Sequence, residues 1–280
     1  MSDYILRDWQ PCDDNALKAL WKTCFGDPDD YIESFFDLFP RQDACVVAEA
    51  EGKPVSAMYI LPGQRLFPYR KKSLTAGYAY ALATLPEYRS RGIGRAVYKA
   101  VSDKILQTAD AACVLPAEQA LYPFYENASG AQPLSYVREA RITKADLSGI
   151  TPSMGARFPT LEYQAVRSQI LSGLPYALLP EEFYELMESS GVEFFVLEHG
   201  VAAAETSHGV CRILELLDPD TDGMSSIAGV ARWCPAEEYI VRSPLFFDGP
   251  GEMRPYMLGA LKEKPSFPMT NDLWWGLGMD

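Results

Sequence analysis

The stretch LATLPEYRSRGIGRA, residues 82–96, decides the fold of this chain. Residues 76–84 combine small and β-type side chains, which predicts a strand that stops at Pro86. Residues 96–101 predict a helix. A glycine-containing loop between a strand and a helix aims unpaired backbone N–H groups and the positive end of the helix dipole at one point. The sequence therefore predicts a binding site for a phosphate or pyrophosphate.

The glycines and arginines of this loop support an anion site. Gly92 and Gly94 leave the backbone open to an anion, and Arg89, Arg91 and Arg95 add positive charge. The loop has neither the lysine of a Walker motif nor the third glycine of a dinucleotide fingerprint. The alternative is an arginine-rich turn in which a glycine only supplies a positive φ. That alternative does not explain three arginines around two glycines.

The spacing of Arg89, Gly92 and Gly94 after a strand, with Pro86-Glu87-Tyr88 before it, resembles the acetyl-CoA loop of the GCN5-related N-acetyltransferase (GNAT) superfamily. The order of elements expected over residues 3–145, β-α-α-β-β-β-α-β-α-β, is also the GNAT order. The resemblance implies an α/β (α+β) fold with a central mixed, mostly antiparallel sheet, and acetyl-CoA as co-substrate. The cofactor-binding residues it implies are Leu82 and Thr84, through their backbone, and Arg89, Ser90, Arg91, Gly92, Ile93, Gly94 and Arg95.

The sequence predicts that the chain forms two structural units. Residues 1–145 form the acetyl-CoA-binding GNAT domain, closed by a strand near residues 135–142, and residues 146–160 form a linker. Residues 161–280 repeat the pattern faintly: the strand–turn–strand at 194–204 parallels that at 46–57, although similar hairpins also arise by chance. Residues 218–223 place three aspartates where the phosphate loop would be, so this degenerate GNAT-like unit would serve substrate binding or dimerisation. The arrangement resembles the two-unit acetyltransferases related to the Eis group.

The family's tyrosine motif is partly present. Residues 124–126, Phe-Tyr-Glu, match it, and the resemblance makes Tyr125 the acid that protonates the leaving CoA thiolate, with Tyr122 as a rival. Both are also explained as core aromatics of a short helix. Glu118 replaces the asparagine of the motif and is a candidate base for the acceptor amine, or a helix cap. Tyr78 and Tyr80 are expected to line the cleft or to pack in the core.

The composition of the chain limits the classes of molecule that it is expected to bind. The 280 residues suit two domains, and the net charge of −13 argues against nucleic acid and favours cationic partners such as amines. Six scattered cysteines and two histidines indicate reduced thiols and no metal site. No apolar run approaches the length of a membrane span, and no signal peptide is evident at the N-terminus. The sequence therefore predicts a cytoplasmic protein.

The predicted function is acetyl-CoA-dependent transfer of an acetyl group to a primary amine of a small, cationic molecule. Two alternatives stay open: a non-catalytic CoA-binding regulatory protein, and a protein or peptide N-acetyltransferase. A homo-oligomer is also compatible with the sequence. The apolar tail, residues 271–280 with Trp274 and Trp275, is expected to dock. The Eis-like resemblance places the chain end in the acetyltransferase cleft, with its carboxylate near the reaction centre, and docking on the second unit is the alternative.

Overall fold

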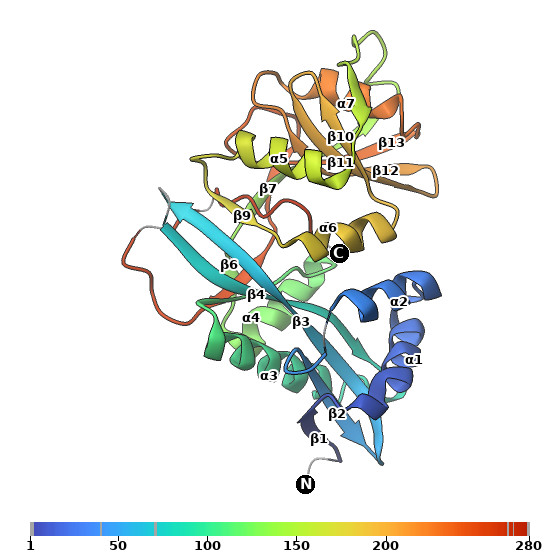
Figure 1. Cartoon of the computed structure of the whole chain (residues 1–280), viewed down its shortest axis with the longest axis vertical. Helices are drawn as coiled ribbons and strands as arrows, with labels where there is room; N and C mark the ends of the chain where they lie inside the picture. The colour runs from blue at the N-terminus through green and yellow to red at the C-terminus, as the bar shows by residue number, and fades with distance from the viewer. Residues whose placement is uncertain (1–2, 40, 70–71, 268, 271, 279–280) are drawn as a thin grey trace.

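Two β-sheets divide the molecule along its long axis (Figure 1). The computed structural model describes residues 3–39, 41–69, 72–267, 269–270 and 272–278. None of the helices in this described part is long and apolar enough to cross a membrane.

The first sheet has the order β1-β2-β3-β4-β5-β15-β6, with β9 beside β3. Its neighbouring strands are antiparallel except for β4 and β5, which are parallel and are joined through α3. The elements up to residue 143 are β1 (Ile5–Asp8), α1 (Asp14–Phe25), α2 (Asp29–Leu38), β2 (Cys45–Ala50), β3 (Lys53–Tyr69), β4 (Lys72–Thr84), α3 (Ile93–Thr108), β5 (Ala111–Val114), α4 (Tyr122–Ser129), β6 (Gln132–Pro133) and β7 (Tyr136–Thr143).

Helices cover both faces of the first sheet. In α3, Val97, Val101 and Ile105 recur every fourth residue and form a buried stripe against one face, which α4 extends. On the other face, α1 and α2 bury Trp21 and Phe35 against the strands. The expected strand and helix on either side of residues 85–92 are therefore present, with the strand ending at Thr84 as predicted.

The second sheet repeats this plan in the order β14-β7-β13-β12-β11-β10-β8. Strands β12 and β13 are parallel and joined through α7, as β4 and β5 are joined through α3. Helix α7 packs on one face, while α5 and α6 pack on the face that meets the first unit. The elements after residue 143 are β8 (Gly155–Arg157), α5 (Thr160–Ile170), β9 (Tyr176–Leu178), α6 (Glu181–Ser189), β10 (Glu193–Leu197), β11 (Gly200–Ser207), β12 (Val210–Leu217), α7 (Met224–Ala231), β13 (Glu238–Ser243), β14 (Glu252–Pro255) and β15 (Leu258–Leu261), of which β9 and β15 belong to the first sheet.

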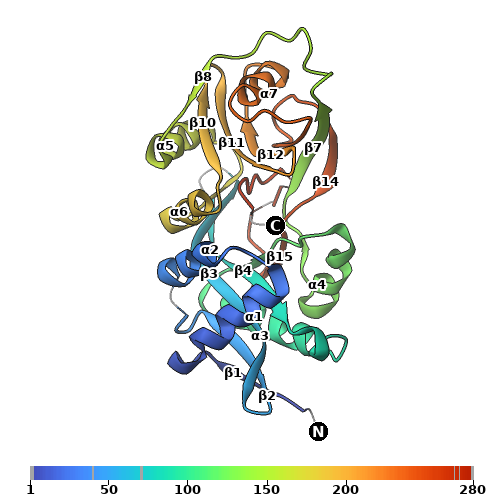
Figure 2. The same cartoon turned by 90° about the vertical axis from the view of Figure 1, so that its right-hand side faces the viewer.

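The two units exchange strands: β7 of the first unit lies in the second sheet, and β15 of the second lies in the first (Figure 2). Strand β9 of the second unit also joins the first sheet, beside β3. Strand β7 leaves the first unit and pairs with β13 and β14 in the second sheet, whereas β15 returns and pairs with β5 and β6 in the first. The prediction that the strand near residues 135–142 closes the first unit is therefore wrong about its sheet, although the strand exists. The expected linker, residues 146–160, also contains β8, which pairs with β10. A cut in this segment would leave the first sheet without β9 and β15, and the second sheet without β7.

The end of the chain is part of the core between the units. Leu273, Trp274 and Trp275 are fully buried in a cluster that joins residues of both sheets. The Trp274 Nε1–H donates to Glu215 Oε2 at 2.5 Å, and Glu215 also accepts from Arg167 Nε at 2.8 Å. Burial of this ion pair is tolerable because further hydrogen bonds satisfy both partners. The tail thus docks on both units, while Asn271, Met279 and Asp280 lie outside the described residues.

Candidate active site

A wedge opens where the parallel strands β4 and β5 separate. They pair from Ala76 and Ala111 to Ala79 and Val114, after which β4 continues to Thr84 paired only with β3. A bulge in the β3–β4 pairing, with a positive φ of 53° at Ala81, bends β4 at this point. The wedge leaves backbone groups of β4 without a strand partner on this side.

Backbone alternation supports the predicted role of Thr84. Leu85 N–H donates to Val55 O at 2.9 Å, so the backbone N–H of the preceding residue, Thr84, points away from β3 and toward the wedge, while the Thr84 carbonyl accepts from Arg89 Nε. Leu82 lies next to the bulge and lines the same opening. The wedge can therefore hold a chain such as pantetheine by strand-like hydrogen bonds.

The loop after β4 presents a helix N-terminus. Gly92 has φ 79° and precedes α3, and the first helical bond of this turn runs from Ala96 N to Gly92 O. No side chain caps α3 in the described part of the chain, so the N–H groups of Ile93, Gly94 and Arg95 remain available to an anion. A Cβ on Gly94 would lie 3.2 Å from Thr84 Oγ1, so glycine is needed here for close packing of helix on strand.

The three arginines surround this N-terminus with different contacts. Arg89 Nε donates to Thr84 O at 3.0 Å, Arg91 lies over the Tyr88 ring, and Arg95 donates to Asn127 O at 2.5 Å. All three side chains, and that of Ser90, are exposed, whereas Ile93 is buried and anchors the helix. The loop residues predicted to bind the cofactor are thus brought together around one opening.

Tyr125 and Tyr122 differ sharply in their surroundings. The Tyr122 hydroxyl is within hydrogen-bond distance of Tyr256 O at 2.7 Å and Pro255 O at 2.9 Å, which ties α4 to the β14–β15 connection. Tyr125 packs edge-on against Tyr98 and lines a cavity beyond the wedge. Burial raises the pKa of Tyr125, so its phenol keeps its proton at neutral pH and can donate it.

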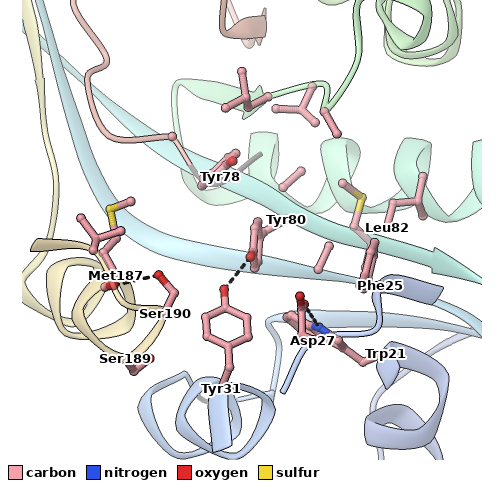
Figure 3. Close-up of a pocket in the computed structure, with 18 of the residues that line it drawn as sticks. Trp21, Phe25, Asp27, Tyr31, Tyr78, Tyr80, Leu82, Met187, Ser189 and Ser190 are labelled. Carbon is pink, nitrogen blue, oxygen red and sulfur yellow. Dashed lines mark hydrogen bonds between the residues drawn. The ribbon is translucent and has the colours of Figure 1, made fainter. Parts of the chain in front are cut away.

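The cavity has a volume of about 570 Å³ and lies between the two units. The first unit supplies aromatic and acidic side chains, including Trp21, Asp27 and Tyr31 (Figure 3). The Tyr31 and Tyr80 hydroxyls form a hydrogen bond of 2.8 Å across it. Both Tyr78 and Tyr80 line the cavity, as one sequence-based alternative expected, and Tyr78 also packs against Trp275.

The second unit supplies the facing wall. Met187, Ser189 and Ser190 come from the end of α6 (Figure 3). Glu205 comes from β11. Near the end of the chain Gly278 also lines the cavity, so the described part of the tail reaches it. Lysine, arginine and histidine do not occur among the described lining residues. The cavity is therefore suited to a positively charged guest.

Two results differ from sequence-based reasoning. Glu118 is exposed, and the described cavity lining does not include it, so the structure does not bring it together with Tyr125. Conversely, sequence reasoning missed Asp27, Tyr31 and Glu205 as lining residues. The one available signal was Glu205, a carboxylate directly after the apolar run 201–204 of a predicted strand. Among the described residues, no group of three or more His, Cys, Asp or Glu is arranged to hold a metal ion.

Comparison with known proteins identifies the fold. Residues 6–128 match the family model described as an acetyltransferase (GNAT) domain. A search of the curated proteins found no match. Solved structures with similar folds include a GCN5-related N-acetyltransferase from Kribbella flavida, with 14% identity, a TM-score of 0.67, and coverage of 93% of this chain and 72% of that one.

Two further structures match the whole two-unit architecture. Eis1 from Mycobacterium abscessus has 13% identity and a TM-score of 0.61, covering 93% of this chain and 74% of its own. A tandem GNAT protein from the clavulanic acid biosynthesis pathway has 12% identity and a TM-score of 0.52, covering 94% and 99%. At such identities these likenesses establish the fold alone. They agree with two units of one kind in a single chain.

Proposed function

We propose that the chain transfers the acetyl group of acetyl-CoA to a primary amine of a small cationic molecule, because residues 6–128 match the family model of an acetyltransferase (GNAT) domain. The observation that carries this proposal is the continuity of the β4–β5 wedge with an acidic, aromatic cavity that Tyr125 lines. The wedge and the N-terminus of α3 fit a thioester carrier with a pyrophosphate. The cavity fits the acceptor.

The cofactor would bind through groups already described. Backbone groups of Leu82 and Thr84 would hold the pantetheine, and the N–H groups at residues 93–95 would hold the pyrophosphate, with Arg89 and Arg91 adding charge. Acetyl-CoA supplies an activated acyl group: a C–N bond forms to the amine as the C–S bond breaks. Tyr125 would donate its proton to the departing thiolate.

The acceptor must reach the reaction centre as a neutral amine, because an ammonium has no lone pair. Acidic groups of the cavity, Asp27, Asp30 and Glu205, would attract the cation, and the rings of Trp21 and Tyr80 offer cation–π faces. Removal of the ammonium proton then precedes attack. This preference for cations separates the proposal from transfer to neutral or anionic acceptors.

Two measurements test the proposal together. Acetyl-CoA should raise the melting temperature in a titration, since it binds only the folded protein. Thiol release should then follow when cationic amines are added, and not with neutral alcohols or amino-acid amides that carry an acidic side chain. Binding of acetyl-CoA without thiol release across a broad amine panel would favour a non-catalytic CoA-binding protein. Turnover with peptides alone would favour a protein N-acetyltransferase.

A further inference from the structure

Tyr256 lies where the chain crosses from the second sheet back to the first. It follows β14 of the second sheet, precedes β15 of the first, and is fully buried. Its backbone N–H donates at 2.9 Å to Ser135 O, on the segment that leads from β6 in the first sheet to β7 in the second. The two crossings are therefore tied together at Tyr256, which fixes its place relative to both sheets.

The Tyr256 hydroxyl binds the tail. It donates to Gly276 O at 3.1 Å, while Arg242 Nη1 lies 3.5 Å from the hydroxyl oxygen as a donor and the guanidinium lies 5.3 Å from the centre of the ring. A hydroxyl has one hydrogen and two lone pairs, so it can donate to the tail and accept from Arg242 at once. Arg242 is in turn paired with Glu139 at 3.0 Å. The hydroxyl is thus oriented by charged groups of the second sheet.

Gly278 packs closely against Tyr256 two residues further along the tail. It is buried and lines the cavity. A Cβ added to Gly278 would lie 2.3 Å from the Tyr256 hydroxyl oxygen and 2.4 Å from Leu115 Cδ2, and both distances are shorter than the contacts that Cβ atoms make in proteins. Leu115 follows β5 and lines the same cavity. The tail therefore supplies part of the cavity wall at a place that Tyr256 and Leu115 define.

The backbone of Tyr256 also reaches the helix of the proposed acid. Its carbonyl accepts the Tyr122 hydroxyl at 2.7 Å, and Tyr122 lies three residues before Tyr125 on α4. Residues at this spacing are neighbours on one side of a helix. The same residue thus contacts α4 through its carbonyl and the tail through its hydroxyl, on opposite sides of the proposed reaction centre's wall.

We propose that Tyr256 is a positioning residue that holds the tail at Gly278 as part of the wall against which the acceptor amine binds. This inference rests on the proposed acetyl transfer, and it gives the tail a part in acceptor binding in addition to its docking. The N-terminus of α3, where the cofactor would bind, is formed by other residues. Loss of the Tyr256 hydroxyl should therefore raise the KM for the acceptor and leave the affinity for acetyl-CoA unchanged.

The test removes this hydroxyl and compares it with a buried hydroxyl elsewhere. Tyr256→Phe removes the bond to Gly276 and keeps the contact with Tyr122, because that contact uses the backbone. Tyr239→Phe is the matched control: Tyr239 is 2% exposed, and its hydroxyl accepts the Ala236 N–H at 3.0 Å outside the described cavity lining. Each variant loses one buried hydrogen bond, so both should lower the melting temperature by a similar amount.

Two measurements then separate a positioning role from a structural one. Hydrogen exchange of the CoA-bound protein, resolved to single residues, should rise at 276–278 in Tyr256→Phe and not in Tyr239→Phe. The Trp274 N–H, which donates to Pro175 O at 3.0 Å, is the internal reference. Kinetics with cadaverine as acceptor should show a KM about two- to tenfold higher in Tyr256→Phe alone, the worth of one neutral hydrogen bond, with the calorimetric affinity for acetyl-CoA unchanged.

Gly278→Ala tests the same contact from the tail. The added Cβ would displace the tail, so the KM for cadaverine should rise at least as much as in Tyr256→Phe. If the two residues act through one contact, the double variant should be no worse than Gly278→Ala, whereas independent effects would multiply.

Unchanged hydrogen exchange at 276–278 in Tyr256→Phe would overturn the inference, and this measurement needs no acceptor. An equal rise in KM for Tyr256→Phe and Tyr239→Phe, or multiplied effects in the double variant, would also overturn it while acetyl transfer stands. Failure of the wild-type protein to bind acetyl-CoA would overturn the proposed function itself.

Discussion

The loop between β4 and α3 and the loop between β12 and α7 hold equivalent places in the two units, and their helices begin alike. Gly92 has φ 79° and Gly223 has φ 80°, each directly before its helix. The first loop surrounds its helix N-terminus with arginines and leaves the N–H groups open. The second loop contains an anion of its own, the carboxylate of Asp218, and this residue is only 3% exposed.

The hydrogen bonds of Asp218 show how the second site is closed. Its Oδ1 accepts the Thr221 N–H at 3.1 Å, and its Oδ2 accepts the hydroxyls of Thr221 at 2.6 Å and Ser226 at 2.7 Å. Asp222 Oδ1 accepts the Met224 N–H at 3.1 Å. The same backbone geometry can therefore serve two ends. Without an acidic side chain in the loop it is open to an external anion, and with one, as at Asp218, it is closed by the chain's own hydrogen bonds.

The largest effect is expected for Gly92→Val. Valine at this positive φ is strained, and relaxation of the loop would move the N–H groups, so affinity for acetyl-CoA should fall by about a hundredfold. Gly223→Val is the matched control, since it places the same strain at the corresponding turn of the second unit. Calorimetry should show weakened binding in the first variant alone. Unchanged affinity in Gly92→Val would refute the placement of the pyrophosphate.

Tyr125→Phe should lower kcat by roughly a hundredfold and leave the affinity for acetyl-CoA unchanged, as expected for loss of a general acid. Tyr122→Phe removes the contact with Tyr256 O and should reduce thermal stability more than kcat. Steady-state kinetics and melting curves of both variants distinguish the two tyrosines. The opposite pattern would exchange their roles.

Asp218→Asn tests the sealed loop. The amide nitrogen that replaces Oδ2 cannot accept both hydroxyls, so the free energy of unfolding should drop by about 1 kcal/mol, or roughly 3 °C in melting temperature. Calorimetry should still find one acetyl-CoA per chain. A second bound acetyl-CoA in this variant would mean that Asp218 alone had kept the second site closed to cofactor.

The smallest effect is expected for Glu118→Gln. Its exposed position outside the described cavity lining predicts a change in kcat/KM of about twofold or less, typical of surface substitutions. The change in kcat/KM is measured by steady-state kinetics with acetyl-CoA and cadaverine at several pH values. A large loss of kcat at low pH that is restored at high pH would return Glu118 to the role of base.

Sequence reasoning found what local spacing encodes. The strand ending at Thr84, the αL glycine and the helix after it follow from residues adjacent in the chain, as does the aspartate-filled loop before α7. The partners of β7 and β15 could not be derived. Neither strand carries a sequence signal for one sheet over the other: β7 mixes polar and apolar residues, and β15 is only four apolar or small residues long.

A cleft between the two units was expected from the sequence, but most of its lining residues could not be derived, because they depend on how the units pack. Tyr80 was expected because it sits on the strand before the loop, but its partner Tyr31 lies on a helix predicted only as a helix. Glu205 and Ser190 belong to the second unit, for which substrate binding was expected without any individual site residue. The assignment of Leu82, Thr84, Arg89 and Tyr125 to cofactor and catalysis stays a prediction that the variants above can test.

The strand exchange also bears on the order of events during synthesis. Strand β5 ends at Val114, but its neighbour β15 begins at Leu258, so the ribosome must complete most of the chain between them. At about 5–20 residues per second this delay is on the order of ten seconds, during which one edge of β5 lacks its final partner. A chain that stops early would carry the whole acetyl-CoA loop and still lack a finished sheet beneath it. Completion of the active site is thereby tied to completion of translation.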